Sequence, residues 1–123
     1  MNKAKVILID DEFLIRKQIR VKIETEELGI EIVGEYSDAK SALEEMEKLQ
    51  PDIVISDICM PEMDGICFSE LCAEHFPGTK VILITESNDF EYARRSIKAG
   101  VHDFLMKPVR KEELNAKNHA HLL

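Results

Sequence analysis

Cysteines, aromatic residues and long apolar runs are all scarce in this sequence. Its 123 residues include three cysteines, no tryptophan and 6% aromatic residues. An odd number of cysteines, without CxxC spacing or a nearby histidine cluster, argues against a disulfide framework and a zinc site. We therefore predict ordinary buried thiols at Cys59, Cys67 and Cys72. The first apolar run, Val6–Ile9, is far too short for a signal peptide or membrane span, so a soluble, cytoplasmic protein is expected.

Positive charge is also in deficit. Lys and Arg total 16 against 24 Asp and Glu, which gives a formal net charge of -8. Such a surface repels nucleic acid backbones and anionic lipids, so direct binding of this segment to DNA or membranes is disfavoured. Apolar residues make up 45% of the chain and charged residues 33%, a balance typical of globular proteins. The length predicts a single domain over residues 1–123.

Short apolar runs alternate with helical patterns along the chain. This alternation is typical of a parallel sheet with helices on both faces, a three-layer α/β sandwich. For five strand and helix units of this size, a flavodoxin-like (βα)5 fold with strand order 2-1-3-4-5 is expected. The more polar second strand and the last strand are expected near the sheet edges, with the glutamates of the second facing water. The predicted strands span residues 5–10, 30–36, 52–57, 80–85 and 101–108.

The predicted helices differ in the strength of their apolar patterns. Isoleucines repeat every four residues from Ile15 to Ile23, which predicts one helix that ends at Gly29. Capping residues for the next two helices are Ser37 or Asp38, and Asp64. The following helix has a thin apolar stripe and is expected to be the least firmly docked; the stripe consists of Phe90, Ala93 and Ile97. The last helix starts near Lys111 and loses its periodicity after Leu114, which predicts a truncated helix or added residues at the C-terminus.

Four of the five predicted strands end in a side chain with useful chemistry. The first ends in Asp10 and Asp11, the third in Asp57, the fourth in Thr85 and the fifth in Lys107. The carboxyl ends of parallel strands share one edge, and in open α/β sheets ligands bind at this edge where the strand order reverses. We therefore expect these side chains to meet.

The three carboxylates would repel one another unless a cation lay among them. Oxygen ligands without histidine or thiolate indicate a hard ion, and Mg2+ suits a small open cluster of this kind. A carboxylate at Asp57 beside Mg2+, with the Lys107 ammonium and the Thr85 hydroxyl nearby, suits in-line phosphoryl transfer with Asp57 as nucleophile. The predicted product is an aspartyl phosphate.

From about Lys5 to the start of the last helix, the chain resembles the receiver domain of two-component response regulators. The segments that carry this resemblance are Ile9–Glu12, Asp57–Gly65, Thr85 and Lys107–Pro108. Singly, these residues have ordinary explanations, such as a helix cap for Asp10 or a solvated charge for Lys107. Their joint placement at four strand ends makes the pattern specific.

The resemblance implies a role for each site residue. Asp57 is the phosphoacceptor and binds Mg2+ together with Asp11 and the main-chain carbonyl of Cys59. Asp10 supports the ion through water. Thr85 and Lys107 contact the phosphoryl group, and a cis peptide bond between Lys107 and Pro108 fixes the direction of the lysine.

The resemblance also implies a signalling switch with a sensor histidine kinase as phosphodonor, and no enzyme activity beyond self-phosphorylation and self-dephosphorylation. Phosphorylation would draw in Thr85, and Phe104, at the position where the family usually has Tyr or Phe, would turn inward. The face built from the fourth helix, the fifth strand and the fifth helix would then change shape. This face is a candidate homodimer interface.

One residue departs from the family pattern. Glu86 follows Thr85, where the family usually has a small residue such as Ala, Gly or Ser. A bulky anion at this position is expected to hinder the approach of a phosphodonor and to oppose the phosphorylated state. By family analogy, Cys59 and Ser87 tune the lifetime of the phosphate.

A narrower likeness concerns the segments Asn88–Ala93 and Gly100–Val109, which are similar to receivers that precede AraC-type helix-turn-helix domains in Gram-positive bacteria. It implies that the natural protein continues beyond Leu123 into a DNA-binding output domain. DNA binding and transcription regulation would then belong to that part.

Three other functions remain as alternatives. A haloacid dehalogenase-type phosphatase also uses an Asp nucleophile with Mg2+, but it normally has a second Asp where this chain has Cys59. A flavodoxin needs a phosphate-binding first loop, and the acidic residues of Asp10–Glu12 would repel a phosphate. The third alternative is a receiver-like interaction module that is not phosphorylated, which Glu86 favours.

Overall fold

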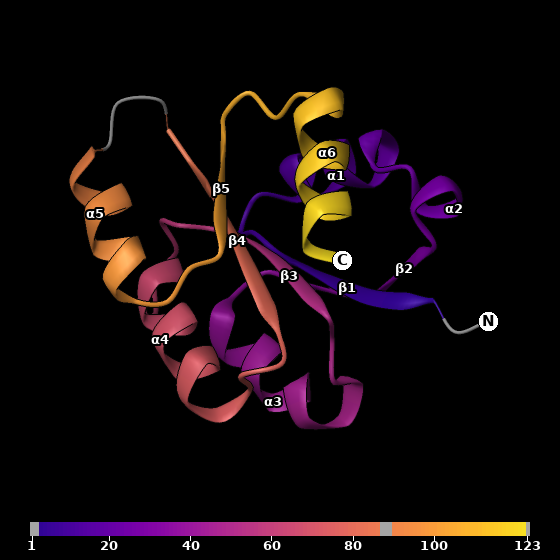
Figure 1. The fold of residues 1–123 in the computed structure, drawn as a ribbon. Coiled ribbons are helices and arrows are strands. Elements are labelled where there is room, and N and C mark those ends of the chain that lie inside the picture. Colours follow the sequence, from indigo (N-terminus) through magenta and orange to yellow (C-terminus); the bar gives the residue numbers. More distant parts are fainter. Residues whose placement is uncertain (1–2, 87–89, 123) are drawn as a thin grey trace.

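A computed structural model of the chain describes residues 3–86 and 90–122. Its elements in chain order are β1 (Ala4–Ile9), α1 (Phe13–Lys22), α2 (Thr25–Leu28), β2 (Ile30–Tyr36), α3 (Ala39–Leu49), β3 (Ile53–Asp57), α4 (Gly65–His75), β4 (Lys80–Thr85), α5 (Phe90–Lys98), β5 (Asp103–Met106) and α6 (Lys111–Leu122). The strands form one parallel sheet in the order β2-β1-β3-β4-β5. Helices α1, α2 and α6 lie on one side of it, and α3, α4 and α5 on the other (Figure 1). The predicted fold, its strand order and its two edge strands are confirmed.

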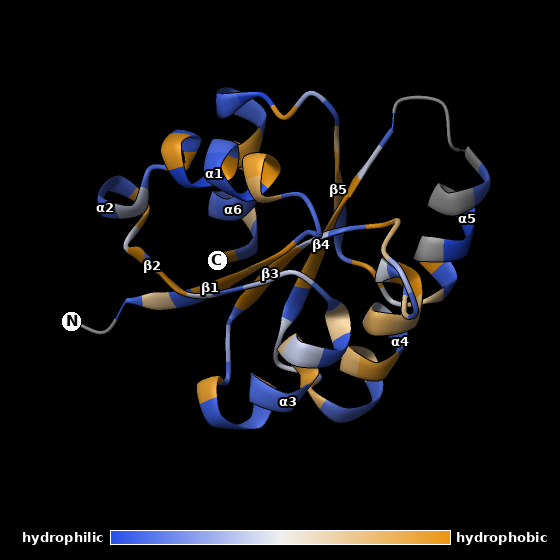
Figure 2. Ribbon diagram, turned by 180° about the vertical axis from the view of Figure 1, so that it is seen from behind, coloured by the Kyte–Doolittle hydropathy of each residue, from blue (hydrophilic) through white to orange (hydrophobic). Residues whose placement is uncertain are grey.

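Both faces of the sheet are covered by hydrophobic clusters, as the continuous apolar runs predict. Alternate residues of the strands point to opposite faces, so each central strand supplies both clusters. Ile7, Val54 and Leu83 face α3 and α4, whereas Leu8 and Ile55 face α1 and α6. The strands accordingly appear as a hydrophobic layer between helices with polar outer surfaces (Figure 2).

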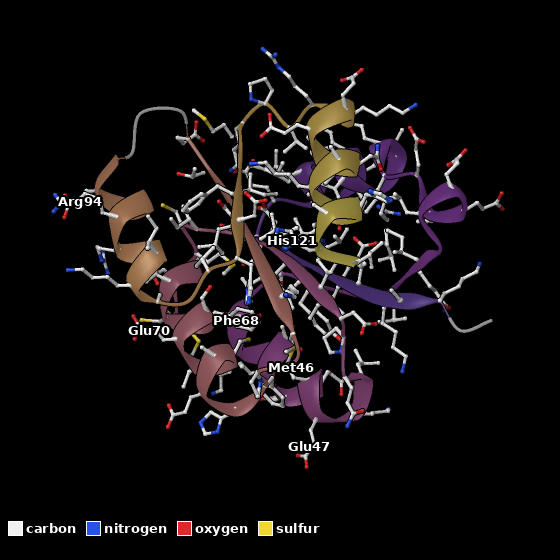
Figure 3. The ribbon with its side chains drawn as sticks, viewed as in Figure 1. Met46, Glu47, Phe68, Glu70, Arg94 and His121 are labelled. Atoms are coloured by element: carbon white, nitrogen blue, oxygen red, sulfur yellow. The ribbon has the colours of Figure 1, made fainter. Side chains whose placement is uncertain are left out.

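The helices on the α3 and α4 side show the same division between inner and outer residues. Met46 and Phe68 are fully buried and point toward the sheet, whereas Glu47, Glu70 and Arg94 project outward (Figure 3). Asp38 and Asp64 cap α3 and α4 as predicted; their side chains accept the N–H groups of residues 41 and 67 at 2.7 and 2.8 Å. In the described ranges, every helix is too short or too polar to cross a membrane.

The single helix predicted to end at Gly29 is divided in two. The backbone leaves the helical conformation at Ile23, and the short helix α2 follows; Gly29, with φ 68°, ends α2 rather than α1. The side chain of Asn115 in α6 bridges the break: it accepts the N–H of Glu24 at 2.7 Å and donates to the carbonyl of Lys22 at 2.9 Å. The break therefore depends on a residue far away in the sequence.

Helix α6 continues to Leu122, well beyond Leu114, where the apolar periodicity ends. The next inward position after Leu114 is occupied by Asn118, which is fully buried and whose amide donates to the carbonyl of Leu114 at 2.8 Å. A polar residue in a core position interrupts the pattern without interrupting the helix. Leu122 again packs against the cluster beside α1.

Three predictions of burial are wrong. Cys59 and Cys67 are exposed, the first in the loop after β3 and the second on the outer side of α4, so that Cys72 alone of the three thiols is buried. Ile97, expected on the apolar stripe of α5, is 69% exposed. The side chains of Phe90 and Ala93, the other members of this stripe, lie outside the described residues. Glu35, expected to face water, is half-buried and pairs with Arg16 and Arg20.

Candidate functional site

Of the side chains expected at the carboxyl edge of the sheet, the structure brings together those of Asp10, Asp57 and Lys107. Asp10 directly follows β1, Asp57 and Thr85 end β3 and β4, and Lys107 directly follows β5. The Nζ atom of Lys107 lies 3.5 Å from Oδ2 of Asp57. Asp10 and Asp57 are close enough for the negative charge of one to raise the pKa of the other. Residues from β1, β3 and β5 therefore meet in one site.

The turn after β1 carries a compact acidic group. Asp10 is 1% exposed, and its Oδ1 accepts the N–H of Glu12 at 2.8 Å. One carboxylate oxygen from each of Asp10, Asp11 and Glu12 lies within 4.8 Å of the other two, and Asp57 does not belong to this close group. Glu12 is not among the ligands predicted from the sequence, although it belongs to the same acidic run. Arg16 donates to the carbonyl of Asp10 and so fixes the turn.

The second carboxylate oxygen of Asp10, Oδ2, is the strongest indication of a cation-binding site. Within the described part of the chain, Oδ2 of Asp10 is buried and has no hydrogen-bond partner. Burial raises the pKa of Asp10 to about 6; the N–H of Glu12 opposes this rise and the charge of Asp57 adds to it. A buried carboxylate oxygen without a partner is costly. The donor set therefore fits a hard divalent cation such as Mg2+.

Asp57 lies in the wall of the same site with 4% exposure. Burial raises its pKa above the ordinary value of a carboxyl group, and the ammonium of Lys107 offsets this only in part. Burial alone would lower the pKa of Lys107, but the nearby carboxylates, Asp57 first, raise it instead. The Asp57 carboxyl group therefore lies beside a Lys107 ammonium that keeps its positive charge.

The backbone around Lys107 holds its side chain over the site. The peptide bond between Lys107 and Pro108 is cis, the form that the resemblance implies. The N–H of Lys107 donates to the carbonyl of Thr85 at 2.9 Å, which joins the ends of β4 and β5. The Lys107 ammonium also reaches a second carboxylate, since its Nζ lies 3.9 Å from Oε1 of Glu86.

Thr85 is 7% exposed, and its hydroxyl is bonded to the backbone of the residue that follows it. Oγ1 donates to the carbonyl of the next residue, Glu86, at 3.3 Å. Phe104 in β5 is half-buried and packs against the cluster that contains Leu83. Ser87, to which a role was assigned by analogy, lies outside the described residues, as do residues 88 and 89 of the narrower likeness.

The loop after β3 returns very close to the strand that it leaves. The N–H of Gly65 donates to the carbonyl of Ile58 at 2.8 Å. A Cβ atom at Gly65 would lie 2.6 Å from the carbonyl oxygen of Asp57, a contact that real Cβ atoms do not make. Glycine at this position therefore permits the loop to pack beside the proposed nucleophile.

Polar side chains connect helix α6 to the start of β5. Asp103 lies 3.0 Å from both Nζ of Lys117 and Nε2 of His121, and the ring of His121 points from α6 toward the sheet (Figure 3). Because α2 is an additional short helix, the face expected from the fourth helix, fifth strand and fifth helix consists of α5, β5 and α6.

This fold and this edge of the sheet define a class of protein. The family described as the response regulator receiver domain matches residues 6–119, and the chain belongs to it. Receiver domains of this family are generally signalling domains without an enzyme activity of their own. A relative can nevertheless be named as an enzyme: the protein-glutamate methylesterase/protein-glutamine glutaminase 1 of Methanospirillum hungatei is 36% identical over 106 residues, which cover 85% of this chain but 31% of that protein.

Particular relatives place the chain among signalling proteins. The uncharacterized transcriptional regulatory protein YhcZ of Bacillus subtilis is 34% identical over 117 residues, 95% of this chain and 54% of the relative. The chemotaxis protein CheY of Thermotoga maritima is 34% identical over 104 residues, 85% of each chain. The solved REC domain of AraT, a response regulator from Geobacillus stearothermophilus, is 35% identical with a TM-score of 0.87, covering 98% of this chain and 92% of that one. The chain spans 54%, 30% and 48% of the length of three relatives named as transcriptional regulators.

Proposed function

We propose that the chain is a phosphorylation-controlled switch in which Asp57 accepts a phosphoryl group from a sensor histidine kinase. The observation that carries this proposal is the contact between the buried Asp57 and the ammonium of Lys107, beside the acidic group of the β1 turn. A carboxylate with a neighbouring cation suits a nucleophile whose phosphorylated product carries up to two negative charges in place of the one of the carboxylate.

The phosphoryl transfer is written as an in-line displacement. A carboxylate oxygen of Asp57 forms a bond to phosphorus, and the bond from phosphorus to the imidazole nitrogen of the kinase histidine breaks with its electron pair. The Lys107 ammonium offsets the charge that develops on the phosphoryl oxygens. Hydrolysis of the acyl phosphate later returns Asp57 to its free form.

Mg2+ is the proposed cofactor. The residues proposed to hold it are Asp11 and Asp57 with the main-chain carbonyl of Cys59, while Asp10 supports it through water. When bound, the ion would neutralise charge on the phosphoryl oxygens. The unpaired Oδ2 of Asp10 and the proximity of Glu12 support a cation at this position.

The proposed switch acts through Thr85 and Phe104. A phosphoryl group offers acceptor oxygens that compete for the Thr85 hydroxyl, which donates to the Glu86 carbonyl in this structure. Movement of Thr85 would make room for the ring of Phe104 to turn inward from its half-buried position. The face of α5, β5 and α6 would change as a result.

We further propose that this face forms a homodimer and controls a transcriptional output domain beyond residue 123. Ile97 and Met106 are large exposed apolar residues on this face. Several relatives are named as transcriptional regulators, and the chain covers about half or less of their length. DNA binding would belong to the output domain, because the chain itself carries a net charge of -8.

The test is intact mass spectrometry of the protein after exposure to acetyl phosphate, with and without Mg2+. We expect a phosphoryl adduct that requires both Mg2+ and Asp57 and is lost in Asp57→Asn. Beryllofluoride binding, followed by NMR, provides a second readout on the same two proteins. An equal adduct in Asp57→Asn would contradict the assignment of Asp57. Absence of any adduct in the wild type under kinase-catalysed transfer would favour the interaction module that is not phosphorylated.

A further inference from the structure

Glu86 contacts both donors that are proposed to hold the phosphoryl group. Its side-chain Oε1 lies 3.9 Å from Nζ of Lys107, and its main-chain carbonyl accepts the hydroxyl of Thr85 at 3.3 Å. Lys107 and Thr85 come from different strands, and their side chains have no other common partner among the residues that the structure describes. One residue therefore engages the two groups that an incoming phosphoryl would need.

The two carboxylates that share Lys107 differ in their surroundings. The Asp57 side chain is 6% exposed and lies 3.5 Å from the ammonium, whereas the Glu86 side chain is 76% exposed. Glu86 thus stands on the solvent side of the ammonium, where a phosphodonor must arrive. Its charge adds to those of Asp10 and Glu12, which also act on Lys107.

A phosphoryl group on Asp57 would replace the single negative charge of the carboxylate with up to two negative charges beside the same ammonium. A single positive charge cannot compensate the phosphoryl group and Glu86 equally, and the two anions repel each other at close range. The repulsion is larger for a donor that carries more negative charge. It is screened by salt because Glu86 is exposed.

We propose that Glu86 is a specificity-determining residue that disfavours phosphorylation of Asp57 by small anionic donors and competes with the phosphoryl group for Lys107. This inference rests on the proposed function, since it takes Asp57 as the nucleophile. In the reaction with acetyl phosphate, the Asp57 oxygen forms the bond to phosphorus and acetate leaves with the electron pair of the broken bond. The same displacement on phosphoramidate releases ammonia.

The test compares wild type, Glu86→Gln and the control Glu47→Gln in Mg2+ buffer. Glu47 projects from α3, away from the carboxyl edge of the sheet, and its substitution changes the net charge by the same amount (Figure 3). Rates of adduct formation are measured with acetyl phosphate and with phosphoramidate, which carries less negative charge at neutral pH. The affinity for beryllofluoride is measured by NMR titration, and each rate is repeated at low and high ionic strength.

We expect Glu86→Gln to react about three- to tenfold faster than wild type with acetyl phosphate at low salt, which corresponds to the removal of one screened charge near the site. The gain should be smaller with phosphoramidate and at high salt, and beryllofluoride should bind more tightly. Glu47→Gln should match the wild type. Unfolding curves should be unchanged because both side chains are exposed.

The outcomes separate this inference from the proposed function. Equal rates in Glu86→Gln and wild type, with an adduct that still requires Asp57, would overturn the role of Glu86 alone. An equal gain in Glu47→Gln would also overturn it, since net charge would then explain the effect. An adduct confined to Glu86→Gln would support the inference in its strongest form. No adduct in either protein would overturn both proposals.

Discussion

At the scale of single residues, the buried carboxyl group of Asp10 lowers the stability of the fold, and the proposed cation site gives a reason for it. Asp10 is buried with one oxygen unpaired and a pKa of about 6, against 3.8 for an ordinary aspartate. Because this pKa is raised on folding, protonation of Asp10 stabilises the native state fully below about pH 4. That stabilisation is lost as the pH rises through 6, so at neutral pH the ionised side chain lowers the free energy of unfolding unless a cation binds.

We therefore predict that Asp10→Asn is more stable than wild type at pH 7.5 without divalent ions, by about 1–3 kcal/mol. The difference should shrink as the pH falls from 6 to 4, and Mg2+ should stabilise the wild type alone. Urea unfolding across this pH range provides the measurement. The matched control is Asp11→Asn, at an exposed neighbour, which should show little change without Mg2+. A destabilised Asp10→Asn at pH 7.5 would contradict the prediction.

Gly65 offers a second residue-scale prediction. A Cβ atom there would collide with backbone at the carbonyl of Asp57, so Gly65→Ala should destabilise the protein by about 1–3 kcal/mol. Gly78→Ala is the control because a methyl group at Gly78 would meet no heavy atom within 4 Å, and its effect should stay within about 0.5 kcal/mol. Equal stability of the two variants, measured by urea unfolding, would show that the loop moves aside without cost.

At this scale, sequence reasoning located the residues at the strand ends because strand ends are easily recognised. It did not find the proximity of Glu12 to Asp10 or the bond from Thr85 to the Glu86 carbonyl, since both depend on side-chain and loop conformations. It misjudged Cys59 and Cys67 by applying the average burial of cysteine to positions that face solvent.

At the scale of elements, the division between α1 and α2 shows what local patterns omit. The isoleucine spacing predicts helical residues correctly as far as Lys22, but the break is stabilised by the side chain of Asn115, which lies in α6. Likewise, the second half of α6 was not predicted because the polar residue Asn118 occupies a core position and interrupts the apolar pattern. The strands were easier, because buried parallel strands are continuous apolar runs; only β5, at four residues, is clearly shorter than predicted.

The role of Asn115 can be tested directly. Asn115→Ala leaves the N–H of Glu24 and the carbonyl of Lys22 without this partner, so we expect a loss of about 1–2 kcal/mol, despite the higher helix propensity of alanine. His119→Ala, at an exposed position of the same helix, is the control. Thermal unfolding measures the loss, and faster hydrogen exchange of the Glu24 amide would locate it. Unchanged exchange at Glu24 would exclude the bridging role.

For the whole molecule, the proposed dimer makes a prediction about association. With Mg2+ and beryllofluoride, we expect sedimentation velocity to show a shift from monomer toward dimer. Ile97→Glu should prevent the shift because it places a charge on the exposed apolar part of the α5, β5 and α6 face. Val21→Glu, at an exposed apolar position of α1 and so outside the α5, β5 and α6 face, is the control. Dimerisation that is lost in Val21→Glu but kept in Ile97→Glu would assign the interface to the surface of α1 instead.

The order of the strands has a further consequence during synthesis of the protein. Asp10 leaves the ribosome well before Lys107, which directly follows the last strand of the sheet to be made, and the edge that joins them forms only when β5 has paired with β4. A nascent or truncated chain that lacks this strand can present its aspartates but not the ammonium that accompanies them. The proposed phosphoryl transfer would therefore become possible only after β5 has been made, so chains that end before this strand would not compete for a phosphodonor.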